Sequence, residues 1–179
     1  YIMRLLTKSK YTTGLACPRH LWMVFHQPER IPDHDAATKL MFEQGHEIGR
    51  LAHTFFPDGI ALPALLEQFS QNIRETAEAL KQKQRKPLFE PGIVAGNLYA
   101  RADILVPVEG GQWDIVEVKS STEVKDEHIQ DVSFQKYCYG RAGLTIRKCF
   151  LAHVNKGYVK RGAINSAELL TQEDITAQV

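Results

Sequence analysis

Two carboxylates and one ammonium group occur in a part of the chain whose pattern predicts paired β-strands. Asp103 interrupts an apolar run, and Glu117 and Lys119 follow in the run 113–119, which is rich in β-branched residues. Side chains alternate along a strand, so Glu117 and Lys119 share one face. A carboxylate among apolar residues is costly to bury unless a metal ion or a cation compensates it. Carboxylates suit Mg²⁺ or Mn²⁺, and a nearby lysine suits an anionic transition state or a metal-bound hydroxide.

The segments around these residues predict an α/β fold with a central mixed β-sheet flanked by helices. Helices are expected at 9–26, 33–56, 65–84 and 127–142. Strands are expected at 88–90, 93–95, 101–106, 113–119, 146–154 and 158–164, with a turn at 155–157. An ordinary sheet with one solvated face would also alternate charged and apolar residues.

The helix 33–56 has the strongest periodicity and contains Gly45 and Gly49, spaced i,i+4. Glycine costs about 1 kcal/mol relative to alanine inside a helix. A pair of glycines on one side therefore predicts the close approach of another backbone.

Three sequence elements occur in an informative order. They are Ala102-Asp103, then Glu117-Val118-Lys119, then Gln135-Lys136-Tyr137-Cys138-Tyr139. In this order and spacing the chain resembles the PD-(D/E)XK nuclease superfamily, in the RecB-like branch that includes the CRISPR-adaptation exonucleases. Alanine replaces the proline of the first motif, and the third element corresponds to Gln-x-x-x-Tyr. The opening segment 6–22 is also similar, so the resemblance covers about residues 5–160. It implies a restriction-endonuclease-like core and metal-dependent cleavage of a nucleic-acid phosphodiester.

The resemblance also implies roles for individual residues. Catalytic roles fall on Asp103, Glu117, Lys119, Gln135 and Tyr139. Ligands to Mg²⁺ or Mn²⁺ would be Asp103, Glu117, the carbonyl of Val118 and a helical histidine, His46 or His53. Further candidate ligands are Glu47 and Glu90, although a surface strand glutamate is the favoured interpretation of Glu90. At about 100° per residue the two histidines share a face nearly opposite the apolar stripe, whereas Glu47 borders the stripe.

Contacts to nucleic acid are expected from small hydroxyl residues after the second strand and from the helix 127–142. The residues are Ser120, Ser121, Gln135 and Tyr139. Glutamine can bond a base or phosphate, and tyrosine can stack on a base. Gln135 and Tyr139 lie one turn apart and face the same way. Ordinary helix packing is the alternative for both.

Composition restricts the remaining possibilities. The net charge of +1 gives no global attraction to nucleic acid, so a basic site would have to be local. Basic clusters, each also explicable as a solvated surface, occur at Lys81, Lys83, Arg85 and Lys86 and at Lys156, Lys160 and Arg161. No apolar run approaches the ~18 residues of a membrane span, and no signal peptide is visible, so a cytoplasmic protein without a membrane partner is expected.

Three cysteines are too few for a disulfide scaffold. Cys17 resembles the first cluster ligand of some RecB-like nucleases, whereas Cys138 and Cys149 lie inside the expected core. Because a cluster needs four thiolates, we do not expect an iron–sulfur cluster within residues 1–179.

The chain is expected to form one nuclease-like domain over residues 1–179. Residues 1–86 would be its mainly helical part, residues 87–164 its sheet-containing catalytic core, and residues 165–179 the start of a further segment beginning with a helix near 171. This predicts an additional domain or protein partner beyond residue 179.

The leading functional hypothesis is a metal-dependent DNA exonuclease, with RNA the less favoured substrate. The alternative is a catalytically silent nucleic-acid-binding or scaffolding module on the same fold, since fold does not determine activity. A hydrolase of a small phosphorylated substrate is ranked last, because the chain has no Gly-rich phosphate-binding loop.

Overall fold

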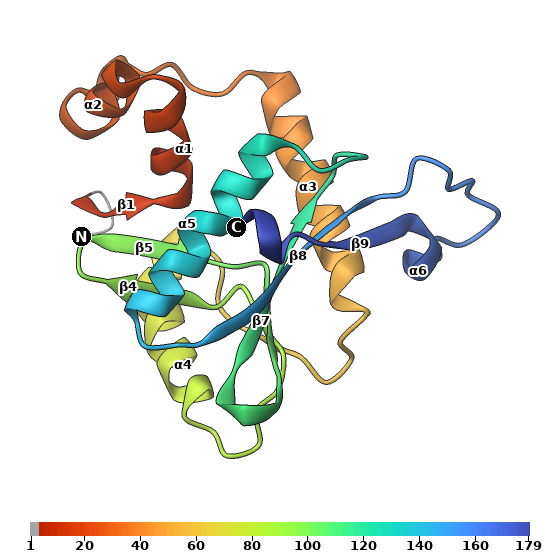
Figure 1. Cartoon of the computed structure of the whole chain (residues 1–179). Helices are drawn as coiled ribbons and strands as arrows, with labels where there is room; N and C mark the ends of the chain where they lie inside the picture. The colour runs from red at the N-terminus through yellow and green to blue at the C-terminus, as the bar shows by residue number, and fades with distance from the viewer. Residues whose placement is uncertain (1–3) are drawn as a thin grey trace.

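The computed structural model describes residues 4–179, and it contains two β-sheets with helices packed around them (Figure 1). The larger sheet has the order β2 (Ile60–Ala61), β3 (Leu88–Phe89), β6 (Ile104–Pro107), β7 (Trp113–Lys119), β8 (Ile146–Val154), β9 (Leu170–Asp174). Strands β3, β6 and β7 run antiparallel, whereas β8 runs parallel to β7. The smaller sheet has the order β1 (Leu6–Thr7), β5 (Leu98–Arg101), β4 (Gly92–Ala95).

Helices lie on both faces of the larger sheet, and others pack against the smaller sheet. They are α1 (Lys8–Ala16), α2 (Pro18–His26), α3 (Ala36–His53), α4 (Phe69–Leu80), α5 (Asp126–Arg141) and α6 (Ser166–Leu169). Short 3₁₀ turns occur at Pro28–Arg30, Leu66–Gln68, Glu109–Gly111 and Thr176–Gln178. Alternate residues of β7 enter different cores: Ile115 packs with residues of α5, and Val116 packs with Ala52 of α3. The expected α/β fold, a central mixed sheet flanked by helices, is confirmed.

Local sequence explains where the first helices begin. Thr7 caps α1 by accepting a hydrogen bond from the Lys10 amide, and Asp35 caps α3 by accepting one from the Thr38 amide. Pro18 occupies the first turn of α2, where its missing amide hydrogen costs nothing. Helix α4 begins later than expected because residues 66–68 form a 3₁₀ turn.

The expected continuous strand 101–106 is wrong, and its interruption determines the position of Asp103. Strand β5 ends at Arg101 in the smaller sheet, and β6 begins at Ile104 in the larger one. The chain makes a similar change of sheet between β3 and β4, where Glu90 has a φ of 58°. The Glu90 amide donates to the Asp103 carbonyl at 3.0 Å, so the two changes of sheet lie side by side.

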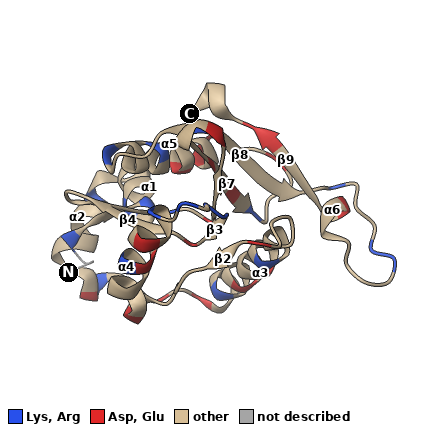
Figure 2. Ribbon diagram, turned by 90° about the horizontal axis from the view of Figure 1, so that it is seen from below, with Lys and Arg blue, Asp and Glu red and all other residues tan. Residues whose placement is uncertain are grey.

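The C-terminal part also differs from the prediction. Residues 158–164 form a loop rather than a strand, and residues 170–174 form β9 rather than a helix. Strand β9 pairs antiparallel with β8 over Phe150–Val154, and this pairing satisfies backbone groups that the edge of β8 would otherwise expose. The intervening loop projects from the body of the molecule (Figure 1) and carries basic residues (Figure 2).

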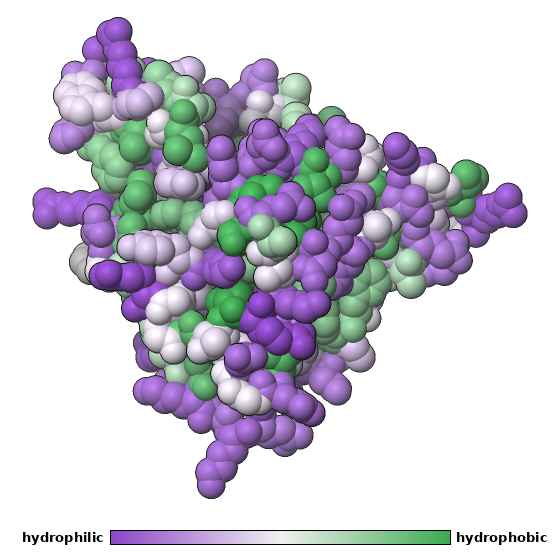
Figure 3. Space-filling view, viewed as in Figure 1, coloured by the Kyte–Doolittle hydropathy of each residue, from purple (hydrophilic) through white to green (hydrophobic). Residues whose placement is uncertain are grey.

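Polar residues cover most of the face seen in Figure 3, with apolar side chains gathered over α1 and α2. Within residues 4–179, no helix combines the length and apolarity needed to cross a bilayer.

Candidate active site

A cavity of about 940 Å³ lies between α3, the N-terminus of α1, the end of β7 and the first turn of α5. Charged residues of both signs line it, including Lys8, Glu90, Asp103, Glu117, Lys119 and Asp131. Figure 2 shows both signs of charge near the end of β7. The expected acidic pair and its lysine therefore meet at one cavity wall.

Glu117 is almost completely buried, with 1% of its surface exposed, and both of its carboxylate oxygens accept hydrogen bonds. Oε1 lies 2.7 Å from Lys8 Nζ and 2.8 Å from Lys119 Nζ. Oε2 accepts a hydrogen bond of 2.7 Å from Gln135 Nε2. Burial alone would raise the pKa of Glu117, but the two ammonium groups outweigh burial and hold this pKa below its usual range. Glu117 is therefore ionised at neutral pH.

Asp103 lies where the chain passes from the smaller sheet to the larger one, and its environment differs from that of Glu117. Its Oδ2 accepts a hydrogen bond of 2.6 Å from the Val118 amide, and no other residue within 4–179 donates to this carboxyl group. Burial and the negative charge of Glu117 raise the pKa of Asp103 to about 7. The pKa values of these two neighbouring carboxyl groups therefore differ widely. Glu117 contacts two lysines, whereas Asp103 contacts no lysine within residues 4–179.

Lys119 contacts two carboxylates, Glu117 at 2.8 Å and Asp131 Oδ2 at 2.6 Å. Burial would lower the pKa of Lys119, but the carboxylates, Glu117 first, outweigh burial and raise this pKa above its usual range. Its ammonium group therefore stays charged at the cavity wall.

Sequence reasoning missed two residues of this site, Lys8 and Asp131. Asp131 had a local signal, because it lies four residues before Gln135 on the same face of a helix. Lys8 had none, since its partner Glu117 is 109 positions away along the chain.

The donor groups fit a divalent cation. Asp103 and Glu117 face the same cavity, and the raised pKa of Asp103 indicates that its surroundings provide too little positive charge for both carboxylates. One oxygen of Asp103 has no hydrogen-bond donor within residues 4–179. Carboxylate oxygens of this kind are the ligands that Mg²⁺ and Mn²⁺ prefer. Among these described residues, no three His, Cys, Asp or Glu side chains form a ready-made metal cluster.

The candidate ligands on α3 lie at different places. His46 lines the cavity and also an adjoining hollow of about 450 Å³ shared with Glu90 and Asp103. The His53 ring stacks on Phe89 with a centroid separation of 3.9 Å, and burial lowers its pKa. Glu47 is exposed and does not line the cavity. His53 also lines the cavity that contains Asp103 and Glu117, but of these three side chains His46 alone also lines the adjoining hollow.

Gly45 and Gly49 line the cavity, and the prediction that they allow close approach of another backbone is wrong. A Cβ atom added at either position would meet nothing within 4 Å. The absence of side chains at these two positions instead leaves space in the wall of the cavity.

Glu90 lies at the cavity in an unusual backbone conformation. Its φ of 58° is in the left-handed region, which residues other than glycine rarely adopt. Its Oε2 accepts from Arg101 Nε at 2.8 Å, and burial raises its pKa. The alternative of an ordinary surface strand glutamate is wrong.

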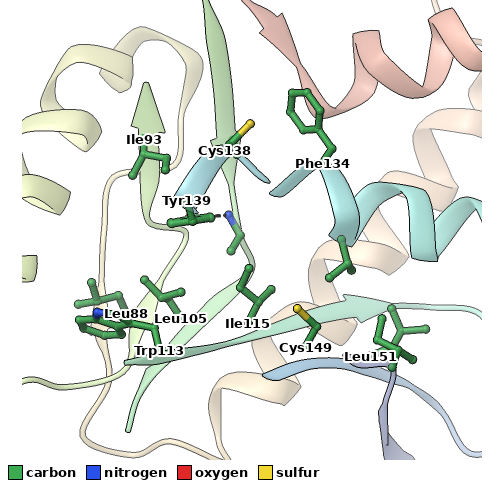
Figure 4. Packing of buried hydrophobic residues seen from close by; sticks show 14 of the residues in the cluster. Leu88, Ile93, Leu105, Trp113, Ile115, Phe134, Cys138, Tyr139, Cys149 and Leu151 are labelled. Carbon is green, nitrogen blue, oxygen red and sulfur yellow. Dashed lines mark hydrogen bonds between the residues drawn. The ribbon is translucent and has the colours of Figure 1, made fainter. Parts of the chain in front are cut away.

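The expected nucleic-acid contacts from α5 are wrong, because Gln135 and Tyr139 are fully buried. Gln135 orients Glu117 instead. The Tyr139 hydroxyl donates to the Pro91 carbonyl and accepts from the Ala102 amide at 3.2 Å. Figure 4 shows Tyr139 among core side chains, with a dashed line to this amide nitrogen. The Tyr139 hydroxyl therefore links Pro91 and Ala102, which lie at the two points where the chain passes from one sheet to the other.

The serines after β7 differ from each other. Ser120 is exposed and lines the cavity, where it can reach a ligand. The Ser121 hydroxyl donates to the Glu123 carbonyl at 2.9 Å and so stabilises its own turn.

Comparisons with known proteins place the chain near two solved structures at low similarity. No protein-family model and no curated protein sequence matches it. A crystal structure of an alkaline exonuclease from Laribacter hongkongensis aligns with 96% of this chain and 77% of its own, at 13% identity and a TM-score of 0.46. The crystal structure of SSO0001 aligns with 97% of this chain and 68% of its own, at 11% identity and a TM-score of 0.41. These values assign neither a family nor an activity.

Proposed function

We propose that this protein is a divalent-metal-dependent nuclease of the RecB-like PD-(D/E)XK type, which hydrolyses phosphodiester bonds of DNA from an end. The observation that carries the proposal is the meeting of Asp103, Glu117 and Lys119 at one cavity. Two carboxyl groups from adjacent strand ends and a charged lysine lie at the same wall, as the sequence motif requires.

In this proposal Asp103 and Glu117, with the carbonyl of Val118, hold Mg²⁺ or Mn²⁺. A bound ion of this kind polarises the scissile phosphate and lowers the pKa of a coordinated water. Lys119 places a fixed positive charge where negative charge develops on the phosphate, because Asp131 anchors its ammonium group from the side of α5. Gln135 holds the Glu117 carboxylate in one orientation through a hydrogen bond of 2.7 Å.

The proposed substrate rests on the space and polar groups beside the acidic pair and on the resemblance of the sequence motifs to those of RecB-like nucleases. The open glycine face of α3 and the exposed hydroxyl of Ser120 leave room for a sugar–phosphate backbone beside the acidic pair. Preference for DNA over RNA, and for ends over internal bonds, follows from the resemblance to the RecB-like branch.

The test is a cleavage assay with four substrates: linear and circular DNA, each single- and double-stranded. Each is incubated with Mg²⁺, Mn²⁺ or EDTA. We expect metal-dependent release of nucleotides from linear DNA and none from circular DNA. Matching RNA substrates test the preference for DNA.

Two lysine variants make the assay specific. Lys119→Met should abolish cleavage, whereas Lys148→Met should not, because Lys148 pairs with Asp174 at 2.8 Å outside the cavity. DNA binding without cleavage in any metal would refute the nuclease and support a silent binding module. Cleavage of circular DNA would refute the exonuclease assignment alone.

A further inference from the structure

Lys8 is a second lysine of the acidic site and comes from a distant part of the chain. It is the first residue of α1, directly after the capping residue Thr7. Helix α1 packs against α5, and Lys8 lines both cavities next to Asp103. Its Nζ lies 2.7 Å from Glu117 Oε1, and about a quarter of its side chain remains exposed.

Glu117 has no uncommitted oxygen while Lys8 is in this position. Oε1 accepts from Lys8 and Lys119, and Oε2 accepts from Gln135. Oε2 keeps one lone pair but faces the fully buried Gln135, whereas both lone pairs of Oε1 are committed, so a cation that reaches Glu117 from the cavity must displace one of the two lysines. The cost of metal binding depends on which donor leaves.

Lys8 is the most easily displaced of the three donors. Lys119 is also held by Asp131 at 2.6 Å, and Gln135 is fully buried on α5. Lys8, by contrast, lies 3.9 Å from Asp131 and makes its close contact with Glu117 alone among residues 4–179. Its long side chain can turn toward solvent without moving a helix.

We propose that Lys8 is a positioning residue that occupies the metal position as an internal counterion and lowers the affinity of the site for divalent cations. This inference rests on the proposed function, because it assumes that Asp103 and Glu117 bind the metal. Without the metal, the Lys8 ammonium compensates the buried charge of Glu117. Metal binding breaks the contact of Lys8 with Glu117 and transfers the ammonium group to water.

The experiment measures Mn²⁺ binding to the whole chain without nucleic acid, by isothermal titration calorimetry and by the electron paramagnetic resonance signal of free Mn²⁺. Lys8→Met should bind Mn²⁺ at least tenfold more tightly than the unaltered protein, which corresponds to about 1.4 kcal/mol. Lys8→Gln, which keeps a donor without its charge, should also bind more tightly and serves if Lys8→Met fails to fold. Lys8→Arg should match the unaltered protein.

Lys148→Met is the matched control, because it removes an equally close lysine–carboxylate pair away from the cavity. It should leave Mn²⁺ affinity unchanged. Equal or weaker Mn²⁺ binding by both neutral Lys8 variants would overturn the role of Lys8 while leaving the proposed nuclease intact. Failure of the unaltered protein to bind Mn²⁺ at millimolar concentration, together with failure to cleave DNA, would overturn the proposed function itself.

Discussion

Replacing Asp103 with asparagine should stabilise the metal-free protein at neutral pH while removing the proposed metal site. The side chains keep the same shape, and an asparagine carbonyl can still accept the Val118 amide hydrogen bond. What the substitution removes is an ionisation that the folded state disfavours. The charged groups around Asp103 are Lys8, Glu90, Glu117 and Lys119.

The sign and size of the effect follow from linkage. The pKa of Asp103 is about 7 in the folded protein and 3.8 ordinarily, so the folded state holds its proton over about three pH units in which the unfolded state has lost it. Stability of the unaltered protein therefore falls as pH rises through this window, by about 1.4 kcal/mol per pH unit. Asp103→Asn should not show this loss of stability, because asparagine does not ionise. The two proteins should be equally stable below pH 4, and the variant should be more stable above pH 7 by at most about 4 kcal/mol.

The measurement is the free energy of unfolding by urea, in EDTA, at intervals from pH 4 to pH 8. Asp174→Asn is a control of opposite sign, because hydrogen bonds from Lys148 and Thr176 hold the pKa of Asp174 below its usual range. That variant should be less stable than the unaltered protein by an amount that stays nearly constant from pH 4 to pH 8, because the ordinary pKa of 3.8 lies below this range. A difference between Asp103→Asn and the unaltered protein that is independent of pH, or that favours the unaltered protein at pH 8, would refute this reasoning.

Metal addition should narrow the difference in stability between the two proteins. With Mn²⁺ at 100 times its dissociation constant, a protein that binds the ion only when folded gains about 2.7 kcal/mol. The unaltered protein should show this gain, and Asp103→Asn should not.

Four further substitutions test separate parts of the site. Lys119→Met should lower single-turnover cleavage at least about 100-fold while calorimetry still detects Mn²⁺ binding; loss of binding would contradict a role in charge stabilisation. Gln135→Leu deprives a buried carboxylate of its donor and should cost about 1–3 kcal/mol in urea unfolding, and no cost would show that the hydrogen bond is dispensable. Tyr139→Phe should lower the free energy of unfolding by a similar amount and leave DNA affinity unchanged. Weakened DNA binding would instead support the expected contact of Tyr139 with nucleic acid. Gly49→Leu should raise stability by up to about 1 kcal/mol yet lower kcat/KM. Gly140→Leu, on an exposed part of α5, should raise stability without affecting cleavage. Equal kcat/KM in the two variants would contradict the inference that Gly49 leaves space for substrate in the cavity wall.

Local patterns in the sequence were sufficient for the main helices and for the shared face of the acidic strand. Helix periodicity and capping residues depend on positions within about one turn of each other, so α1, α3 and α5 could be predicted. Glu117 and Lys119 share a face because strand side chains alternate, whatever the partner strand. The types and order of the acidic residues also led to the chemistry that is proposed for the site.

Sequence did not predict the C-terminal strand or the interruption at Asp103. The segment 170–174 has no strand periodicity of its own, with one buried residue followed by exposed ones, and it becomes β9 because β8 has an open edge. The chain leaves one sheet for the other at residues 102–103, where the Ala102 amide donates a hydrogen bond to Tyr139 of α5, a residue 37 positions away along the chain.

The sequence by itself determined which groups can do chemistry at this site, and the tertiary structure decided their partners and their charge. Lys8 and Glu117 are 109 positions apart, yet their contact helps to keep Glu117 ionised while Asp103 titrates near pH 7. Burial likewise gives Gln135 and Tyr139 supporting roles beneath the cavity. Desolvation and Coulomb interactions depend on distance through space, and local sequence patterns carry no information about that distance.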